Sequence, residues 1–114
     1  MHLNEAVRYL DELLRVPEIG DYPQAMNGLQ VENSGGISRL GAAVDATEAV
    51  IKEAAEAQVD FLIVHHGLFW NGAQRVTGAN YRKTRMLMEA DMAVYSAHLP
   101  LDLHPSLEIG RAHV

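Results

Sequence analysis

Apolar and polar residues recur along the chain with helical spacing in three places. Between residues 3 and 14, leucine, alanine and valine return every three or four positions with charged residues between them, which predicts an amphipathic helix that ends before Pro17 and Gly20. Similar spacing predicts a helix that opens after Asp45 and ends near Gln58, and another over residues 81–90. The periodicity therefore predicts three helices.

Strand patterns lie between these helices. Alternation over residues 27–32 predicts a short half-exposed strand, and residues 37–44 predict a second one. The turn sequence of residues 33–36 lies between them and predicts a hairpin. Residues 61–64 are all apolar, which indicates a strand covered on both faces, and residues 92–95 predict a further strand. We therefore expect an α/β fold with a mixed sheet flanked by helices.

Composition narrows the classes of function. The 114 residues carry a formal net charge of −6 without a run of lysine and arginine, so nucleic-acid binding is not expected. The chain has no cysteine, so any metal must be held by nitrogen and oxygen ligands. No apolar run approaches the length of a membrane span and no secretory signal pattern is present, so we expect a cytoplasmic protein without membrane contact.

Candidate chemistry lies where two predicted strands end. His65 and His66 follow the buried strand, while His98 and Asp102 follow the strand over residues 92–95. Ligands of open α/β sheets bind outside the carboxyl ends of the strands, and a right-handed crossover would make these two strands neighbours. Imidazole and carboxylate ligands suit zinc, iron, manganese, nickel or cobalt without separating them. The sequence thus predicts a divalent-metal site.

The adjacency of His65 and His66 suggests how many ions the site holds. Successive side chains of a strand point to opposite faces, so neighbouring histidines seldom chelate one ion. Two ions, one on each imidazole and bridged by a carboxylate or water, fit this geometry better. Gly67 would permit the sharp turn that brings both rings to one crevice.

Structural explanations compete with several of these assignments. Histidine pairs in ordinary proteins are often satisfied polar groups of a core. Asp45 and Glu48 match a capping box, so Asp45 is expected to cap a helix rather than to act in catalysis. His104 is expected in a turn and His2 in solvent. Phe69 and Trp70 could stack on a planar substrate or belong to a core or interface.

Four motifs, taken in order, resemble those of one family. They are Asp21-Tyr22, Asn27-Gly28-Leu29-Gln30-Val31-Glu32, Val64-His65-His66-Gly67-Leu68-Phe69-Trp70, and His98-Leu99-Pro100-Leu101-Asp102 followed by His104-Pro105. This set resembles the YbgI-like family, also called GTP cyclohydrolase type-two-like or NIF-three-like. The resemblance implies an α/β protein with a dinuclear divalent-metal centre, assembled as a ring-shaped homohexamer.

The resemblance also assigns roles. By their place in the motifs, His65, His66 and Asp102 match family metal ligands, and His98 matches a histidine in or beside the site. The implied function is metal-dependent hydrolysis of a nucleotide or similar small substrate. The alternative is a non-catalytic metal-binding module whose ring and metals serve regulation or assembly.

The chain departs from the family pattern in two ways. Family members take a further histidine and glutamate ligand from near the end of a longer chain, so residues 1–107 are expected to be the N-terminal portion of a dinuclear-metal domain. We expect this portion alone to show weak or partial metal occupancy and little activity. The family motif also continues past His104-Pro105, whereas here it breaks after Leu107. Residues 109–114 match the translation of a sequencing adapter, and we hypothesise that residues 108–114 are a non-native read-through tail.

Overall fold

The three predicted helices and four strands are all present. A computed structural model describes residues 1–16, 26–69 and 74–98 of the chain. The helices are α1 (Leu3–Leu13), α2 (Glu48–Glu56) and α3 (Ala79–Ala90), and the strands are β1 (Gly28–Val31), β2 (Leu40–Asp45), β3 (Phe61–His66) and β4 (Ala93–Ser96). The α/β expectation is confirmed. The predicted buried strand continues two residues further than expected, so that both histidines belong to β3.

One mixed sheet joins the four strands in the order β1-β4-β3-β2. Strands β2, β3 and β4 are parallel to one another, and β1 lies antiparallel to β4. The hairpin predicted from the turn at residues 33–36 is therefore wrong, because β1 and β2 lie at opposite edges of the sheet. Each parallel pair is connected through a helix, as parallel strands require.

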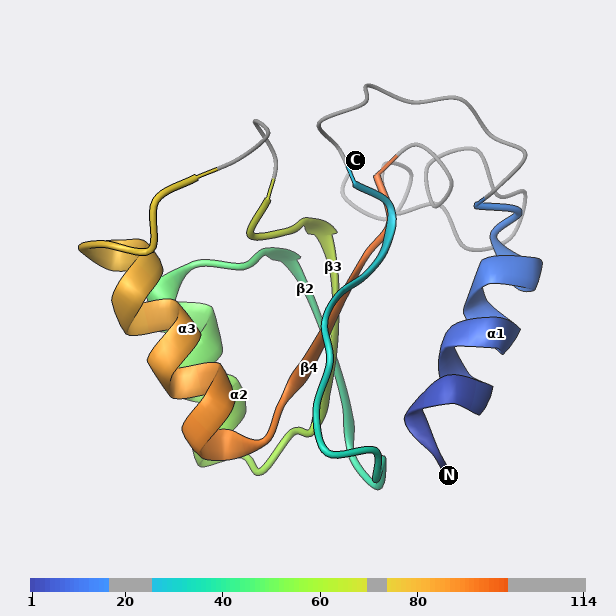
Figure 1. The fold of residues 1–114 in the computed structure, drawn as a ribbon. Helices are drawn as coiled ribbons and strands as arrows, with labels where there is room; N and C mark the ends of the chain where they lie inside the picture. The colour runs from blue at the N-terminus through green and yellow to red at the C-terminus, as the bar shows by residue number, and fades with distance from the viewer. Residues whose placement is uncertain (17–25, 70–73, 99–114) are drawn as a thin grey trace.

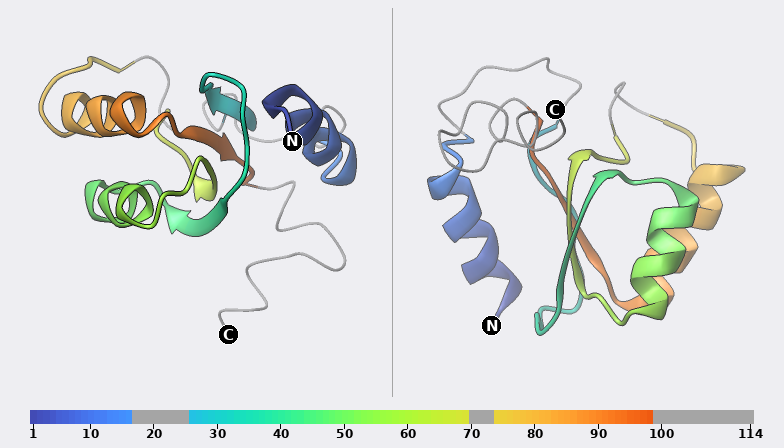
Figure 2. Two further views of the ribbon diagram at one scale, coloured as in Figure 1. Left: turned by 90° about the horizontal axis from the view of Figure 1, so that it is seen from below. Right: turned by 180° about the vertical axis from the view of Figure 1, so that it is seen from behind.

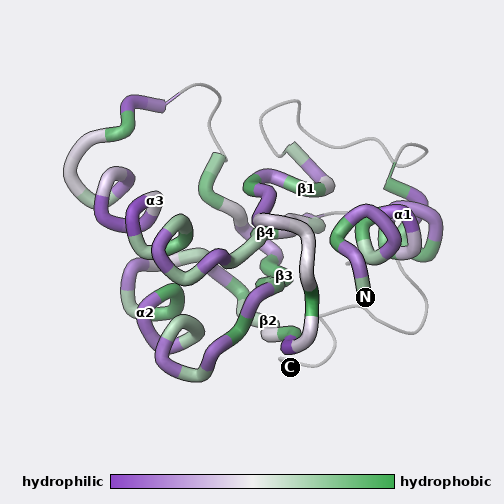
Figure 3. The backbone as a smooth tube through the Cα atoms, turned by 60° about the horizontal axis from the view of Figure 1, so that its bottom comes forward, coloured by the Kyte–Doolittle hydropathy of each residue, from purple (hydrophilic) through white to green (hydrophobic). Residues whose placement is uncertain are grey.

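Helices cover both faces of the sheet (Figures 1 and 2): α2 and α3 lie on one face, and α1 lies on the other. Successive residues of β3 therefore enter different cores. Leu62 and Val64 pack with α2 and α3, whereas Phe61 belongs to the core beneath α1. This confirms that β3 is covered on both faces. Figure 3 shows hydrophobic segments in the central strands and alternating hydrophobic and hydrophilic residues around the helices.

The turn at residues 33–36 joins elements at the amino ends of the parallel strands instead of closing a hairpin. The side-chain amide of Asn33 donates to the carbonyl oxygens of Asp60 and Asp91, which precede β3 and β4. The backbone N–H of Leu3 donates to the Gly35 carbonyl at 2.7 Å, which ties the start of α1 to the same turn. The prediction of a turn is confirmed, but its bonding partners are distant in sequence.

A buried tyrosine connects α1 to the sheet. The Tyr95 side chain is fully buried, and its hydroxyl donates to Asp11 Oδ1 on α1 at 2.6 Å. Burial, followed by the hydrogen bond to the Asp11 carboxylate, raises the pKa of Tyr95 well above its ordinary value. The phenol therefore stays neutral and acts as a fixed donor.

No helix in the described part of the chain is long and apolar enough to cross a membrane.

The Asp60 side chain binds the two residues that precede β2. Its carboxylate accepts hydrogen bonds from the Ser38 N–H, the Ser38 hydroxyl and the Arg39 N–H, at 2.9–3.1 Å. Burial opposes ionisation, but the hydrogen bonds from Arg39 and Ser38 outweigh it, so the pKa of Asp60 lies below its ordinary value of 3.8. Because the folded pKa is depressed, this stabilisation is present above pH 3.8 and is lost as the pH falls through the folded pKa.

We predict that Asp60→Asn lowers the free energy of unfolding at pH 7 by about 1–2 kcal/mol, since a charged acceptor of three donors is lost. Urea unfolding followed by circular dichroism between pH 2 and 7 (roughly the span in which carboxyls titrate) measures this. The difference between wild type and variant should shrink on acidification. Glu56→Gln, at an exposed carboxyl, is the matched control. An equal difference at all pH values would contradict the assignment.

Candidate metal centre

The carboxyl ends of the three parallel strands lie at one edge of the sheet. Asp45 at the end of β2 lies directly opposite His66 at the end of β3. Val64 lies opposite Ser96, the last residue of β4, and His98 follows two residues later. The predicted convergence of the two histidine-bearing strand ends is therefore confirmed.

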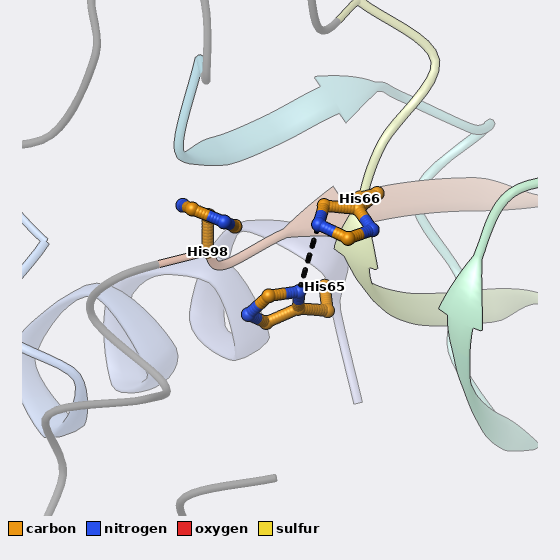
Figure 4. Close-up of side chains that lie close together, drawn as sticks. All are labelled: His65, His66 and His98. Carbon is orange, nitrogen blue, oxygen red and sulfur yellow. Dashed lines mark hydrogen bonds between the residues drawn. The ribbon is translucent and has the colours of Figure 1, made fainter. Parts of the chain in front are cut away.

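Three imidazoles meet at this edge (Figure 4). His65, His66 and His98 each offer a ring nitrogen, and these three atoms all lie within 4.8 Å of one another. His65 Nδ1 lies 3.2 Å from His66 Nε2. The His98 ring centroid lies 4.5 Å from that of His65 and 5.3 Å from that of His66. His66 and His98 are only partly buried, so a ligand from solvent can reach the cluster.

This donor set fits a divalent transition metal. Imidazole nitrogens are the ligands that zinc, iron, nickel and cobalt accept. Two nitrogens bound to one tetrahedral ion at about 2.0–2.1 Å are about 3.3 Å apart, close to the observed 3.2 Å between His65 and His66. The cluster can therefore hold a metal ion, and the spacing of His65 and His66 already matches that of two ligands of one ion.

The expectation that both rings of His65 and His66 reach one crevice is confirmed, but strand alternation does not describe how they lie there. Inside β3 the side chains do alternate between the two cores, but at the strand end the two rings turn toward one another, with centroids 4.5 Å apart. On the side of β4 the ladder ends at Val64 and Ser96, so only β2 pairs with His66. Strand alternation consequently gives no count of the ions, and the dinuclear expectation depends on the family resemblance.

The reason given for Gly67 also changes. Gly67 does not have a positive φ, so the turn requires no glycine conformation there. A Cβ at this position would instead overlap the side-chain oxygen Oε1 of Gln30. Gly67 leaves the space that the end of the Gln30 side chain from β1 occupies.

Asp45 was assigned the wrong role from the sequence. The N-cap of α2 is Thr47, whose hydroxyl accepts from the Val50 N–H at 3.1 Å. Asp45 remains in β2, and its Oδ1 lies 2.6 Å from His66 Nδ1. The capping-box match misplaced the helix start by two residues, and the parallel register of β2 with β3 was the signal that could have paired Asp45 with His66.

The other candidates have different outcomes. Asp102, His104 and Trp70 lie outside the described residues. His98, which was predicted to lie in or beside the site, lies in the cluster itself. Phe69 packs against the core of α2 and α3, which supports its structural assignment. His2 is exposed as expected and caps α1, where its Nδ1 accepts from the Asn4 N–H at 3.1 Å.

Similar sequences carry one recurring name. A protein of Deinococcus radiodurans named "GTP cyclohydrolase 1 type 2 homolog" is 44% identical over 105 residues, which are 91% of this chain and 39% of that protein. An Archaeoglobus fulgidus protein with the same name is 39% identical over 104 residues, or 91% of this chain and 42% of its own length. The chain thus spans about two-fifths of the curated relatives it matches.

Solved structures share the fold. The protein TTHA1606 from Thermus thermophilus has a TM-score of 0.89 and 44% identity, covering 95% of this chain and 44% of that one. A protein described as "ybgI, unknown function" has a TM-score of 0.87 and 37% identity, covering 95% and 43%. The sequence model of the Duf34/NIF3 (NGG1p interacting factor 3) family matches residues 1–110. On these grounds the chain belongs to the Duf34/NIF3 family.

Proposed function

We propose that His65, His66 and His98 are nitrogen ligands of a dinuclear divalent-metal centre, which Asp102 and further carboxylate and imidazole ligands complete in a longer protein. The observation that carries the proposal is the convergence of three imidazole nitrogens within 4.8 Å at the carboxyl edge of the sheet. Satisfied core histidines would not require three rings at one solvent-accessible edge. This is also where α/β sheets bind their ligands.

Asp45 supports this proposal through its contact with His66. Metal-binding histidines almost always donate their second ring N–H to a carboxylate, carbonyl or water. With a neutral ring, His66 Nδ1 donates to Asp45 Oδ1 at 2.6 Å, which leaves the lone pair of Nε2 facing His65. Asp45 is therefore a positioning residue in this proposal, and His66 is a ligand through Nε2.

The reaction class that fits best is hydrolysis of a nucleotide or similar small substrate. A bound divalent ion would supply Lewis acidity and activate water near neutral pH. The name shared by the relatives supports a nucleotide, although it describes them as homologues of a cyclohydrolase. We further propose a cytoplasmic protein that self-associates, as the ring-shaped hexamer expected from the resemblance would require.

The metal site predicts a specific loss of affinity. In isothermal titrations of this chain with Zn²⁺ or Co²⁺, His98→Ala should weaken binding roughly tenfold or more, a loss of about 1.4 kcal/mol or more, because one of three nitrogens is removed. His2→Asn is the matched control, since it deletes an imidazole from the opposite end of the molecule and keeps a capping acceptor. Equal affinity in His98→Ala and wild type would contradict the proposed ligand set.

The reaction class is tested on the complete, metal-loaded protein with nucleotides and phosphoesters as substrates. We expect turnover that falls to background in His65→Ala, because the proposed centre loses a ligand. Metal content measured in parallel separates the two functions. Bound metal without turnover of any substrate would favour the non-catalytic regulatory or assembly module, and absence of transition metal would favour purely structural histidines.

The role of Asp45 is tested without metal. In ¹⁵N NMR of the imidazole nitrogens, wild-type His66 should carry its proton on Nδ1, and Asp45→Ala should move it toward Nε2 because the carboxylate acceptor is gone. Thr47→Ala should leave the tautomer unchanged while destabilising the chain by about 1 kcal/mol through loss of the α2 cap. The opposite pattern would restore the assignment of Asp45 as the helix cap.

A further inference from the structure

Strand β1 is the one element of the described sheet that runs against the other three. Its first residue, Gly28, lies opposite Ser96, the last residue of β4. The amino end of β1 therefore reaches the same edge as the carboxyl ends of β2, β3 and β4. Side chains near the start of β1 can contact the segments that follow the histidine-bearing strands.

Asn27 contacts the segment that carries His98. Its side-chain Oδ1 accepts a hydrogen bond from the backbone N–H of His98 at 2.8 Å. His98 lies beyond the end of β4, where the sheet ladder no longer fixes its backbone. The Asn27 carboxamide replaces the missing ladder partner at that residue.

Gln30 contacts the segment that follows His66. Its Oε1 accepts from the backbone N–H of Leu68 at 2.8 Å and of Phe69 at 3.4 Å. Its Nε2 donates to the Met26 carbonyl at 3.2 Å, which holds the carboxamide in one orientation. The oxygen of Gln30 thus lies in the bend of the chain directly after the histidine pair.

A β-bulge places the Gln30 side chain there. Leu29 pairs with Tyr95 and Val31 with Val94, so Gln30 is an extra residue of β1 between two consecutive pairings with β4. Bulges re-aim side chains and are common beside functional sites. Gly67 leaves the space that Gln30 fills, since a Cβ there would also lie 2.6 Å from Gln30 Cδ and Nε2.

We propose that Asn27 and Gln30 are positioning residues that hold the two histidine-bearing segments in the geometry that binds metal. Two carboxamides, one at the start of β1 and one within it, fix the backbone on both sides of the cluster, at His98 and just after His66. The arrangement of the three imidazoles thereby depends on β1, which contributes no metal ligand itself. The proposal depends on the proposed function only for its metal readout.

The first test is independent of metal. Amide hydrogen exchange of the metal-free chain should be at least roughly tenfold faster at Leu68 in Gln30→Ala, and at His98 in Asn27→Ala, because each N–H loses its acceptor. Asn27→Asp keeps an oxygen in place and should restore protection at His98. The Ala93 N–H, bonded to the Asp60 carbonyl at the opposite end of the sheet, is the internal control. Unchanged exchange at Leu68 and His98 would overturn the proposal.

The second test combines two substitutions in a double-mutant cycle. Gly67→Ala should weaken Zn²⁺ binding in the wild-type background, because the new Cβ displaces Gln30 and the adjacent segment. In the Gln30→Ala background the same change should cost little, since the colliding carboxamide is absent. Loss of a partner that orients a metal ligand typically weakens affinity about 10–100-fold, and we expect Gln30→Ala to fall in that range.

The outcomes separate the two proposals. Additive effects of Gly67→Ala and Gln30→Ala, or wild-type affinity in Gln30→Ala, would show that Gln30 does not position the ligands. Absence of any Zn²⁺ binding by the wild type would overturn the metal centre and leave the exchange test to decide whether Asn27 and Gln30 hold the two segments. Gln30→Met keeps the side-chain volume and removes the acceptor. It replaces Gln30→Ala in the exchange and affinity measurements if Gln30→Ala unfolds.

Discussion

The parallel ladder of β2, β3 and β4 is the constraint on which the candidate site depends. Parallel strands end at the same edge, so residues separated by roughly twenty to thirty positions become neighbours without any specific contact between their side chains. The register sets Asp45 opposite His66 and Val64 opposite Ser96, which carries His98 to the same place. A shift of one residue in the pairing of β2 with β3 would turn the Asp45 side chain to the other face of the sheet.

Local patterns in the sequence predicted the helices and strands. They did not predict which strands that are distant in sequence pair with each other. Helical spacing and the apolar run of β3 are properties of neighbouring residues, and they predicted the helices and the strand covered on both faces. The hairpin prediction failed because the partner of β1 is β4, which lies far along the chain beyond β2 and β3. A turn sequence shows that the chain bends, but it does not show which strand the chain then joins.

The candidate site could likewise be predicted where its residues carry a local signal, but not where they depend on pairing between distant strands. His65, His66 and His98 were found because they follow strands, a local signal, and their convergence followed from general rules of α/β topology. The contact of Asp45 with His66 depends on register, and the role of Gly67 depends on a side chain from β1 that reaches it through a bulge. Neither relation has a signature within a short window of sequence. Asp45 was therefore explained as a helix cap and Gly67 by a sharp turn, and the structure corrects both explanations.

The charge of the cluster explains why its histidines alone would not complete the proposed dinuclear centre. Three neutral imidazoles bring no negative charge to a divalent cation, and two cations at the distance of a dinuclear site, about 3.5–4 Å, repel each other strongly. Carboxylates must therefore supply the compensating charge. Asp45 supplies part of it indirectly, because its oxygen faces Nδ1 of His66 and makes the opposite nitrogen a better donor. A bridging carboxylate would have to come from outside the described residues, where Asp102 lies, and the longer relatives have further chain from which to provide others.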